Sequence, residues 1–121
     1  GKRGMIHFLA FFFLAAPAYA DLEPFIEEAP AARAFDAHVY CLGYALFERR
    51  GDTRDASIIA AEVVQACAEQ AEALRAALTD VYRRRPSLIG ADEDPGHAAD
   101  YYLGGARDRA VNAIREFRNR R

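Results

Sequence analysis

The sequence has few of the side chains that carry catalytic chemistry. Residues 21–121 contain no lysine and only two serines, two threonines and two histidines. The Gly-x-Ser-x-Gly elbow of serine hydrolases and the glycine-rich loop of phosphate-binding proteins are both missing. We therefore predict that the chain has no catalytic residue and is not an enzyme. A small hydrolase acting in the cell envelope is an alternative.

Cysteine is equally scarce, and the only two copies, Cys41 and Cys67, exclude several cofactor sites. They do not form the Cys-x-x-Cys of thiol redox enzymes or the Cys-x-x-Cys-His of c-type haem attachment. With His38 they would supply three zinc ligands, but a fourth is missing. Residues 92–96 begin with three acidic residues, as a calcium-binding loop would, but the glycine expected at the sixth position and the glutamate expected at the twelfth are missing. The sequence therefore predicts no cofactor and no metal.

Basic residues are outnumbered as well. Residues 21–121 contain 14 arginines against 18 aspartates and glutamates, which gives a formal net charge of −4. Because a general nucleic-acid binder needs a basic surface, we predict no nucleic-acid partner. The charges are also uneven: residues 21–36 are mainly acidic, whereas residues 107–121 include six arginines.

The start of the chain has the three-part pattern of a secretory signal peptide. Residues 1–20 comprise a basic beginning, an apolar run and the small residues of a cleavage site. The apolar run has about a dozen residues, whereas a membrane-spanning helix needs roughly 20. We therefore expect cleavage between Ala20 and Asp21 and export to the periplasm or the medium. Residues 21–121 would then form one small domain.

Helical periodicity dominates the rest of the sequence. Apolar residues recur every three or four positions in residues 34–48, in residues 56–85 and again after Pro95. No segment shows the alternation of a β-strand. An all-α fold with three amphipathic helices is therefore expected, and the second helix is the longest.

Capping residues mark the ends of these helices. Asp52 or Asp55 is suited to cap the second helix, and Asp94 followed by Pro95 is suited to begin the third. The pair Gly104-Gly105 weakens the first half of the third helix and favours a kink there.

The two cysteines lie at matching heights on the first two helices. Cys41 precedes Gly51 by 10 residues and Cys67 follows Asp55 by 12. At about 1.5 Å per residue they therefore lie roughly 15 and 18 Å from the turn. Both occupy the apolar face of their helix, and an exported protein meets an oxidising environment. We predict a disulfide that staples an antiparallel helical hairpin, with two buried free thiols as the alternative.

The pattern Cys…Gly-Asp-x-x-Asp-Ala-x-x-Ile-Ala…Cys over residues 41–67 resembles that of small exported bacterial helical proteins. The resemblance covers about a quarter of the chain. It implies a disulfide-linked helical hairpin, and it implies no activity, cofactor or functional residue.

The first helix also carries a second apolar face. Tyr40, Tyr44 and Phe47, here termed the outer stripe, recur at i, i+4 and i+7, roughly opposite the face that holds Cys41. One helix cannot present both faces to a single neighbour. Either the third helix or residues 22–26 cover the outer stripe, or it is the binding site for a protein partner. Tyrosine and phenylalanine are enriched in interface cores.

These observations predict a small exported binding or adaptor protein whose partner and oligomeric state the sequence does not identify. The alternative is peripheral membrane binding, because the third helix has one apolar and one basic side, as helices on anionic membrane surfaces do. The apolar side holds Tyr102, Leu103, Ile114 and Phe117, and the basic side holds Arg109 and Arg115.

Overall fold

A computed structural model describes residues 29–120, and every regular element in that range is a helix. The elements are α3 (Ala29–Glu48), α4 (Ala56–Ala66), α5 (Ala68–Arg84), the short 3-10 helix η2 (Pro86–Leu88), α6 (Pro95–Gly104) and α7 (Ala106–Asn119). The predicted all-α class is confirmed over these residues. The predicted signal peptide, its cleavage site and residues 22–26 lie outside them.

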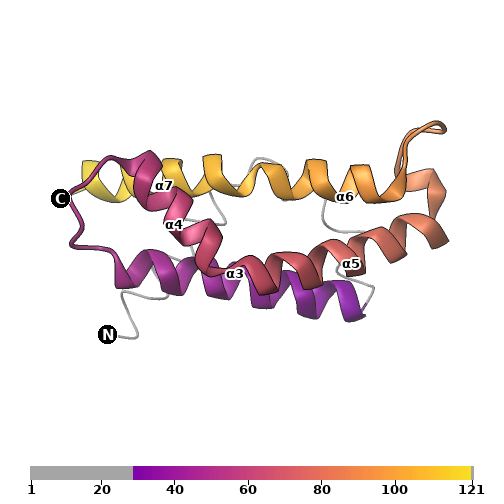
Figure 1. Ribbon diagram of the computed structural model, residues 1–121, viewed down its shortest axis with the longest axis horizontal. Helices are drawn as coiled ribbons and strands as arrows, with labels where there is room; N and C mark the ends of the chain where they lie inside the picture. The colour runs from indigo at the N-terminus through magenta and orange to yellow at the C-terminus, as the bar shows by residue number, and fades with distance from the viewer. Residues whose placement is uncertain (1–28, 121) are drawn as a thin grey trace.

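The helices form three long rods (Figure 1). α3 lies along the lower edge of the view and runs from right to left, and α4 and α5 lead back to the right. α6 and α7 follow one another along the upper edge and run to the left. α5 packs against α3 and α6, whereas α4 packs against α7 and α3. The middle rod therefore contacts both of the others.

The middle rod is not the continuous helix predicted over residues 56–85. It is interrupted at Cys67, whose φ of −107° and ψ of 23° leave the helical range. The Cys67 N–H donates to the carbonyl of Val64 instead of reaching back four residues. No glycine or proline marks this position, so the sequence pattern missed it. The interruption allows α4 to pack on α7 while α5 packs on α6, and tertiary packing therefore overrides local helix propensity here.

The two predicted helix caps are confirmed, whereas α3 begins at Ala29, before the periodic residues 34–48. The Asp55 carboxylate accepts from the Ser57 N–H at 2.8 Å and caps α4. The Asp94 carboxylate accepts from the His97 N–H at 3.0 Å and caps α6, with Pro95 in its first turn. Gly105 separates α6 from α7, so the single third helix expected from the sequence is two helices, divided where a kink was predicted.

Buried apolar side chains form two clusters, one towards each end of the bundle. The turn-side cluster joins the later half of α3 to α4 and α7, and its largest buried members are Leu42, Leu46, Ile59 and Val63. The loop-side cluster joins the beginning of α3 to α5 and α6, and its largest buried members are Leu74, Leu78, Val81 and Tyr82. Phe35 packs against both clusters, so α3 is the element that connects them.

Candidate functional site

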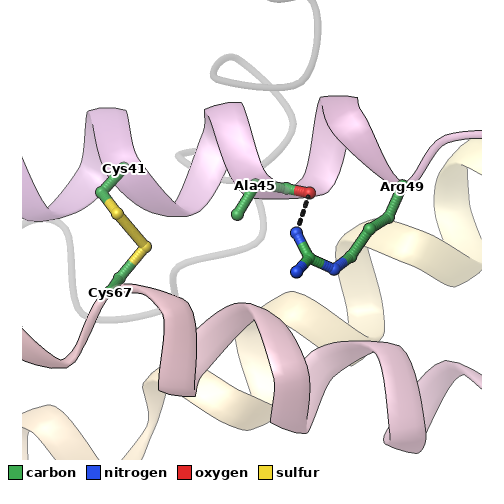
Figure 2. Close-up of a disulfide and its surroundings, with 4 residues drawn as sticks. All are labelled: Cys41, Ala45, Arg49 and Cys67. Carbon is green, nitrogen blue, oxygen red and sulfur yellow. Dashed lines mark hydrogen bonds between the residues drawn. A yellow bond between two sulfur atoms is a disulfide. The ribbon is translucent and has the colours of Figure 1, made fainter.

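The predicted disulfide between Cys41 and Cys67 is present (Figure 2). The Cα atoms of the two cysteines are 5.9 Å apart, within the range that a disulfide requires. Cys67 is fully buried in the turn-side cluster and Cys41 packs at its edge. The bond therefore fixes the middle of α3 to the point where α4 gives way to α5.

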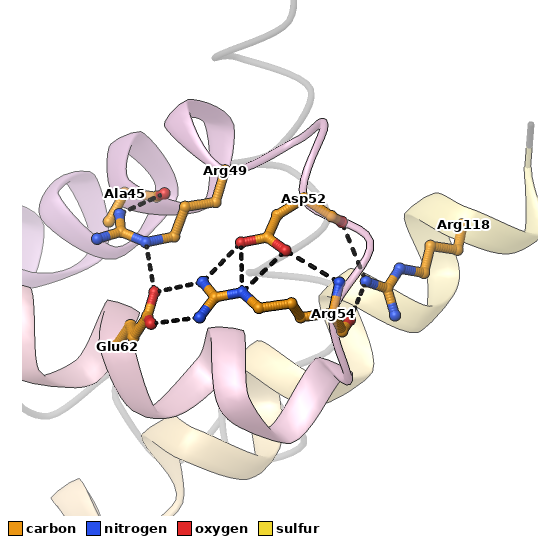
Figure 3. Close-up of polar contacts among 6 residues, drawn as sticks. All are labelled: Ala45, Arg49, Asp52, Arg54, Glu62 and Arg118. Atoms are coloured by element: carbon orange, nitrogen blue, oxygen red, sulfur yellow. Dashed lines mark hydrogen bonds and ion pairs between the residues drawn. The ribbon is translucent and has the colours of Figure 1, made fainter.

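A network of charged side chains closes the turn between α3 and α4 (Figure 3). The Arg54 guanidinium forms hydrogen-bonded ion pairs with Asp52 at 2.7 Å and with Glu62 at 2.8 Å. Arg49 pairs more loosely with Glu62, at 3.6 Å, while donating to the Ala45 carbonyl (Figures 2 and 3). The network thus joins the end of α3, the turn and α4.

Electrostatics keep both acids of this network ionised. Hydrogen bonds from Arg54 lower the pKa of Asp52 to about 2, and they also lower the pKa of Glu62. Acids held ionised in this way are poor proton donors near neutral pH. Arg118 of α7 donates to the backbone carbonyls of Asp52 and Arg54, at 3.1 and 2.6 Å. These contacts indicate that the charged turn holds the helices together.

A pocket lies beside this turn, lined by apolar and charged residues of α3, the turn, α4 and α7. Its cavity volume is about 10 Å³, which is no more than one water molecule needs. Sites for small organic ligands are far larger, at several hundred Å³. The pocket therefore does not hold a metabolite in this conformation.

A different set of polar groups lies inside the bundle, where the two clusters meet. His38 of α3 is 3% exposed, and burial, followed by the positive charge of Arg109, lowers its pKa to about 4. The imidazole is therefore neutral at physiological pH. Burial raises the pKa of Tyr102 to about 12 and lowers the pKa of Arg109, whose guanidinium lies 5.8 Å from the Tyr102 ring centre.

The position of Arg109 corrects one expectation from the sequence. Periodicity placed Arg109 on the basic side of the third helix with Arg115, but Arg109 is half-buried and only Arg115 is exposed. The missing side chain of Gly105 leaves room for the guanidinium, because a Cβ atom there would lie 2.9 Å from Nη1 of Arg109. The sequence around Arg109 carries no signal for this position, because the position depends on contacts with α3, which brings His38 near the guanidinium.

Two of the three side chains of the outer stripe are exposed on α3. Tyr40 is 58% exposed and Tyr44 is 49% exposed, so the third helix, which forms α6 and α7, does not cover them. Phe47 is half-buried against the turn-side cluster, and the guanidinium of Arg50 lies 4.1 Å from its ring centre. The outer stripe therefore consists of two solvent-exposed tyrosines and one half-buried phenylalanine.

The apolar side of the third helix is packed inside the molecule. Ile114 is buried in the turn-side cluster, against which Phe117 also packs. Tyr102 and Leu103 pack against the loop-side cluster. None of the described helices is long and apolar enough to cross a membrane.

The described residues contain no cluster of three or more potential metal ligands. His38 lies on the inner side of α3, where its charge neighbour is Arg109, and both cysteines are consumed by the disulfide. In the acidic loop, Asp94 caps α6, and Glu93 Oε2 accepts from the Gly90 N–H at 3.4 Å. These side chains therefore have structural partners.

Comparison with known proteins adds no relative. The chain matches no protein-family model, no curated protein and no solved structure.

Proposed function

We propose that this chain is a small exported, non-catalytic binding protein that contacts a protein partner through the outer stripe of α3. The observation that carries the proposal is the exposure of Tyr40 and Tyr44, 58% and 49%, on a helix whose opposite face is packed. Tyrosine combines a large apolar surface with a hydroxyl group and has only two side-chain torsions. It therefore contributes strongly to protein interfaces at a small entropic cost.

The disulfide supports this role because it fixes the helix that carries the stripe. In the proposed arrangement, the Cys41–Cys67 bond staples α3 to the middle rod as a hairpin. A binding surface that is already rigid loses less conformational entropy when the partner binds. The disulfide is also consistent with the oxidising environment of an exported protein.

The packing of the third helix favours a protein partner over a membrane surface. An interfacial helix must insert apolar side chains among the lipids. On α7, Ile114 is buried and Phe117 is packed against the turn-side cluster. Membrane insertion of this helix would therefore require its separation from the bundle.

Site-specific photocrosslinking tests the proposal in the cell that exports the protein. A photoreactive phenylalanine analogue replaces Tyr44 in the full chain, and a matched control places it at Tyr101, which is 82% exposed on α6. We expect a discrete protein adduct from position 44 and none from position 101, and we expect Tyr40→Ala to weaken the adduct. Equal labelling from both positions would contradict the proposal.

The stability of a double variant distinguishes a binding surface from core. Tyr40→Ala with Tyr44→Ala should change the free energy of unfolding by no more than about 0.5 kcal/mol for each substitution, as exposed positions do. A loss of several kcal/mol in chemical denaturation would show that the stripe is part of the core.

A further inference from the structure

The outer stripe continues towards the start of α3 with a regular spacing. Arg33, Ala37, Tyr40, Tyr44 and Phe47 are separated by four, three, four and three residues. This is the repeat by which one helix packs along another in a coiled coil. All are exposed except Phe47, which is half-buried, and we call this set the extended stripe. Such a surface fits another helix better than it fits a flat partner.

Among residues 29–120, no other helix covers Tyr40 or Tyr44 of α3. α3 forms one edge of the bundle in Figure 1, and the other described helices lie on its opposite side. The inner face of α3, with Leu42 and Leu46, is already buried against those helices. A second helix can therefore approach only from the side of the extended stripe.

The charges at the two ends of the stripe are opposite. Arg33 lies at the beginning, and Glu48 lies at the end, next to Phe47. Both are exposed, and neither side chain has a hydrogen bond or an ion pair among residues 29–120. The two residues are 15 positions apart, which corresponds to about 22 Å along the helix.

When two such stripes pair in antiparallel fashion, each of these charges faces an opposite charge on the other copy. When the pairing is centred between Tyr40 and Cys41, Arg33 of each copy faces Glu48 of the other. The same register places the small Ala37 of each copy opposite the large Tyr44 of the other, so that a small side chain faces a large one. A parallel pairing would instead place Arg33 against Arg33 and Glu48 against Glu48, which is repulsive.

We propose that the partner of the outer stripe is a second copy of this chain, bound through an antiparallel contact between the two α3 helices. This inference rests on the proposed function and names the partner of the same site. Two-fold symmetry makes the contact self-complementary, so each charge pair occurs twice. Because one helix face buries less than the roughly 800 Å² per partner of a standard interface, the dimer is weak and depends on concentration.

Charge reversal in the full exported protein tests the register. Sedimentation analysis over a range of concentrations gives the dimer dissociation constant for the wild-type chain, for Arg33→Glu, for Glu48→Arg and for the double variant. Each single change makes both ion pairs repulsive, and we expect it to raise the dissociation constant about tenfold. The double variant restores both attractive pairs and should return to within about threefold of the wild type.

A matched control reverses an exposed charge away from the stripe. Arg107→Glu, on α7, should leave the dissociation constant unchanged. A dimer that responds equally to this control, or that does not respond to either single change, would overturn the antiparallel contact.

The crosslinking experiment separates failure of this inference from failure of the proposed function. An adduct between two copies, formed from position 44 and mapped to α3 of the other copy, supports the dimer. A chain that stays monomeric at every concentration while position 44 captures a different protein overturns the dimer and leaves the proposed function intact. A monomer without any adduct overturns both.

Discussion

The two ends of the bundle are held together by different kinds of interaction. On the turn side, the branched side chains of Leu42, Ile59 and Val63 are fully buried next to the disulfide. On the loop side, Leu74, Leu78 and Val81 are buried as well, and α6 adds mainly the small Ala98 and Ala99, but no disulfide joins these helices. The turn-side helices are thus joined by a covalent bond as well as by packing.

The ionisable groups also differ between these regions. Around the turn, Asp52, Arg54 and Glu62 are paired at the surface, where solvent reduces the cost of their charges. At the junction of the clusters, His38 is buried and Arg109 is half-buried, and burial lowers both of their pKa values. From this comparison we expect the stability of the fold to depend on redox state through the disulfide near the turn side. We expect it to depend on pH through the groups at the junction.

Removal of the disulfide should have the largest effect on the free energy of unfolding. Cys41 and Cys67 are 26 residues apart in sequence, and closing a loop of that length stabilises a fold by about 3.5 kcal/mol in the chain-entropy model. We expect reduction to lower the free energy of unfolding by this amount in urea denaturation. The double variant Cys41→Ala with Cys67→Ala should show the same loss without reductant, and an unchanged denaturation midpoint would contradict the prediction.

Acid should produce the second-largest effect, through His38. Because burial lowers its pKa from 6.5 to about 4, the unfolded chain binds a proton on His38 before the folded chain does as the pH falls. The free energy of unfolding should therefore decrease from about pH 6.5 down to about pH 4, by about 3 kcal/mol in total, and this contribution is complete above pH 6.5. Urea denaturation at a series of pH values measures it.

Two histidine variants provide the controls for the acid effect. His38→Gln should remove most of the pH dependence in this window, because the lowered pKa of Glu62 contributes only at its acidic end, whereas His97→Gln should retain it because His97 is exposed. The loss of the Asp52 contribution belongs to lower pH, since its pKa is about 2 in the folded protein. Equal pH profiles for the His38 variant and the wild type would count against the junction as the sensitive region.

The smallest expected effect comes from the glycine pair between α6 and α7. Alanine is favoured over glycine in a helix by about 1 kcal/mol, and a Cβ atom on Gly104 would contact nothing within 4 Å. A Cβ atom on Gly105 would lie 2.9 Å from Nη1 of Arg109 and would displace the guanidinium. In thermal unfolding, Gly104→Ala should be stabilising. The Gly105→Ala variant should be less stable than the Gly104→Ala variant by about 1 kcal/mol.

Local sequence rules predicted the features that depend on neighbours in the chain. The Asp55 and Asp94 caps, the disulfide pairing and the all-α class follow from side-chain chemistry, helical spacing and residue counts. The assignment of Tyr40 and Tyr44 to a face opposite the core also followed from periodicity, and both side chains are exposed. That these tyrosines bind a partner remains a prediction.

Tertiary structure decided the features that depend on contacts between distant segments. The break at Cys67 has no local signal, because it arises where α4 and α5 pack against different helices. The inward position of Arg109 likewise depends on α3, which brings His38 next to it. By itself the sequence determined which residues form helices and which faces are apolar, because those properties repeat every few residues. Only the packed bundle decided where a helix breaks and which charge is buried, because both depend on neighbours that are far away in the chain.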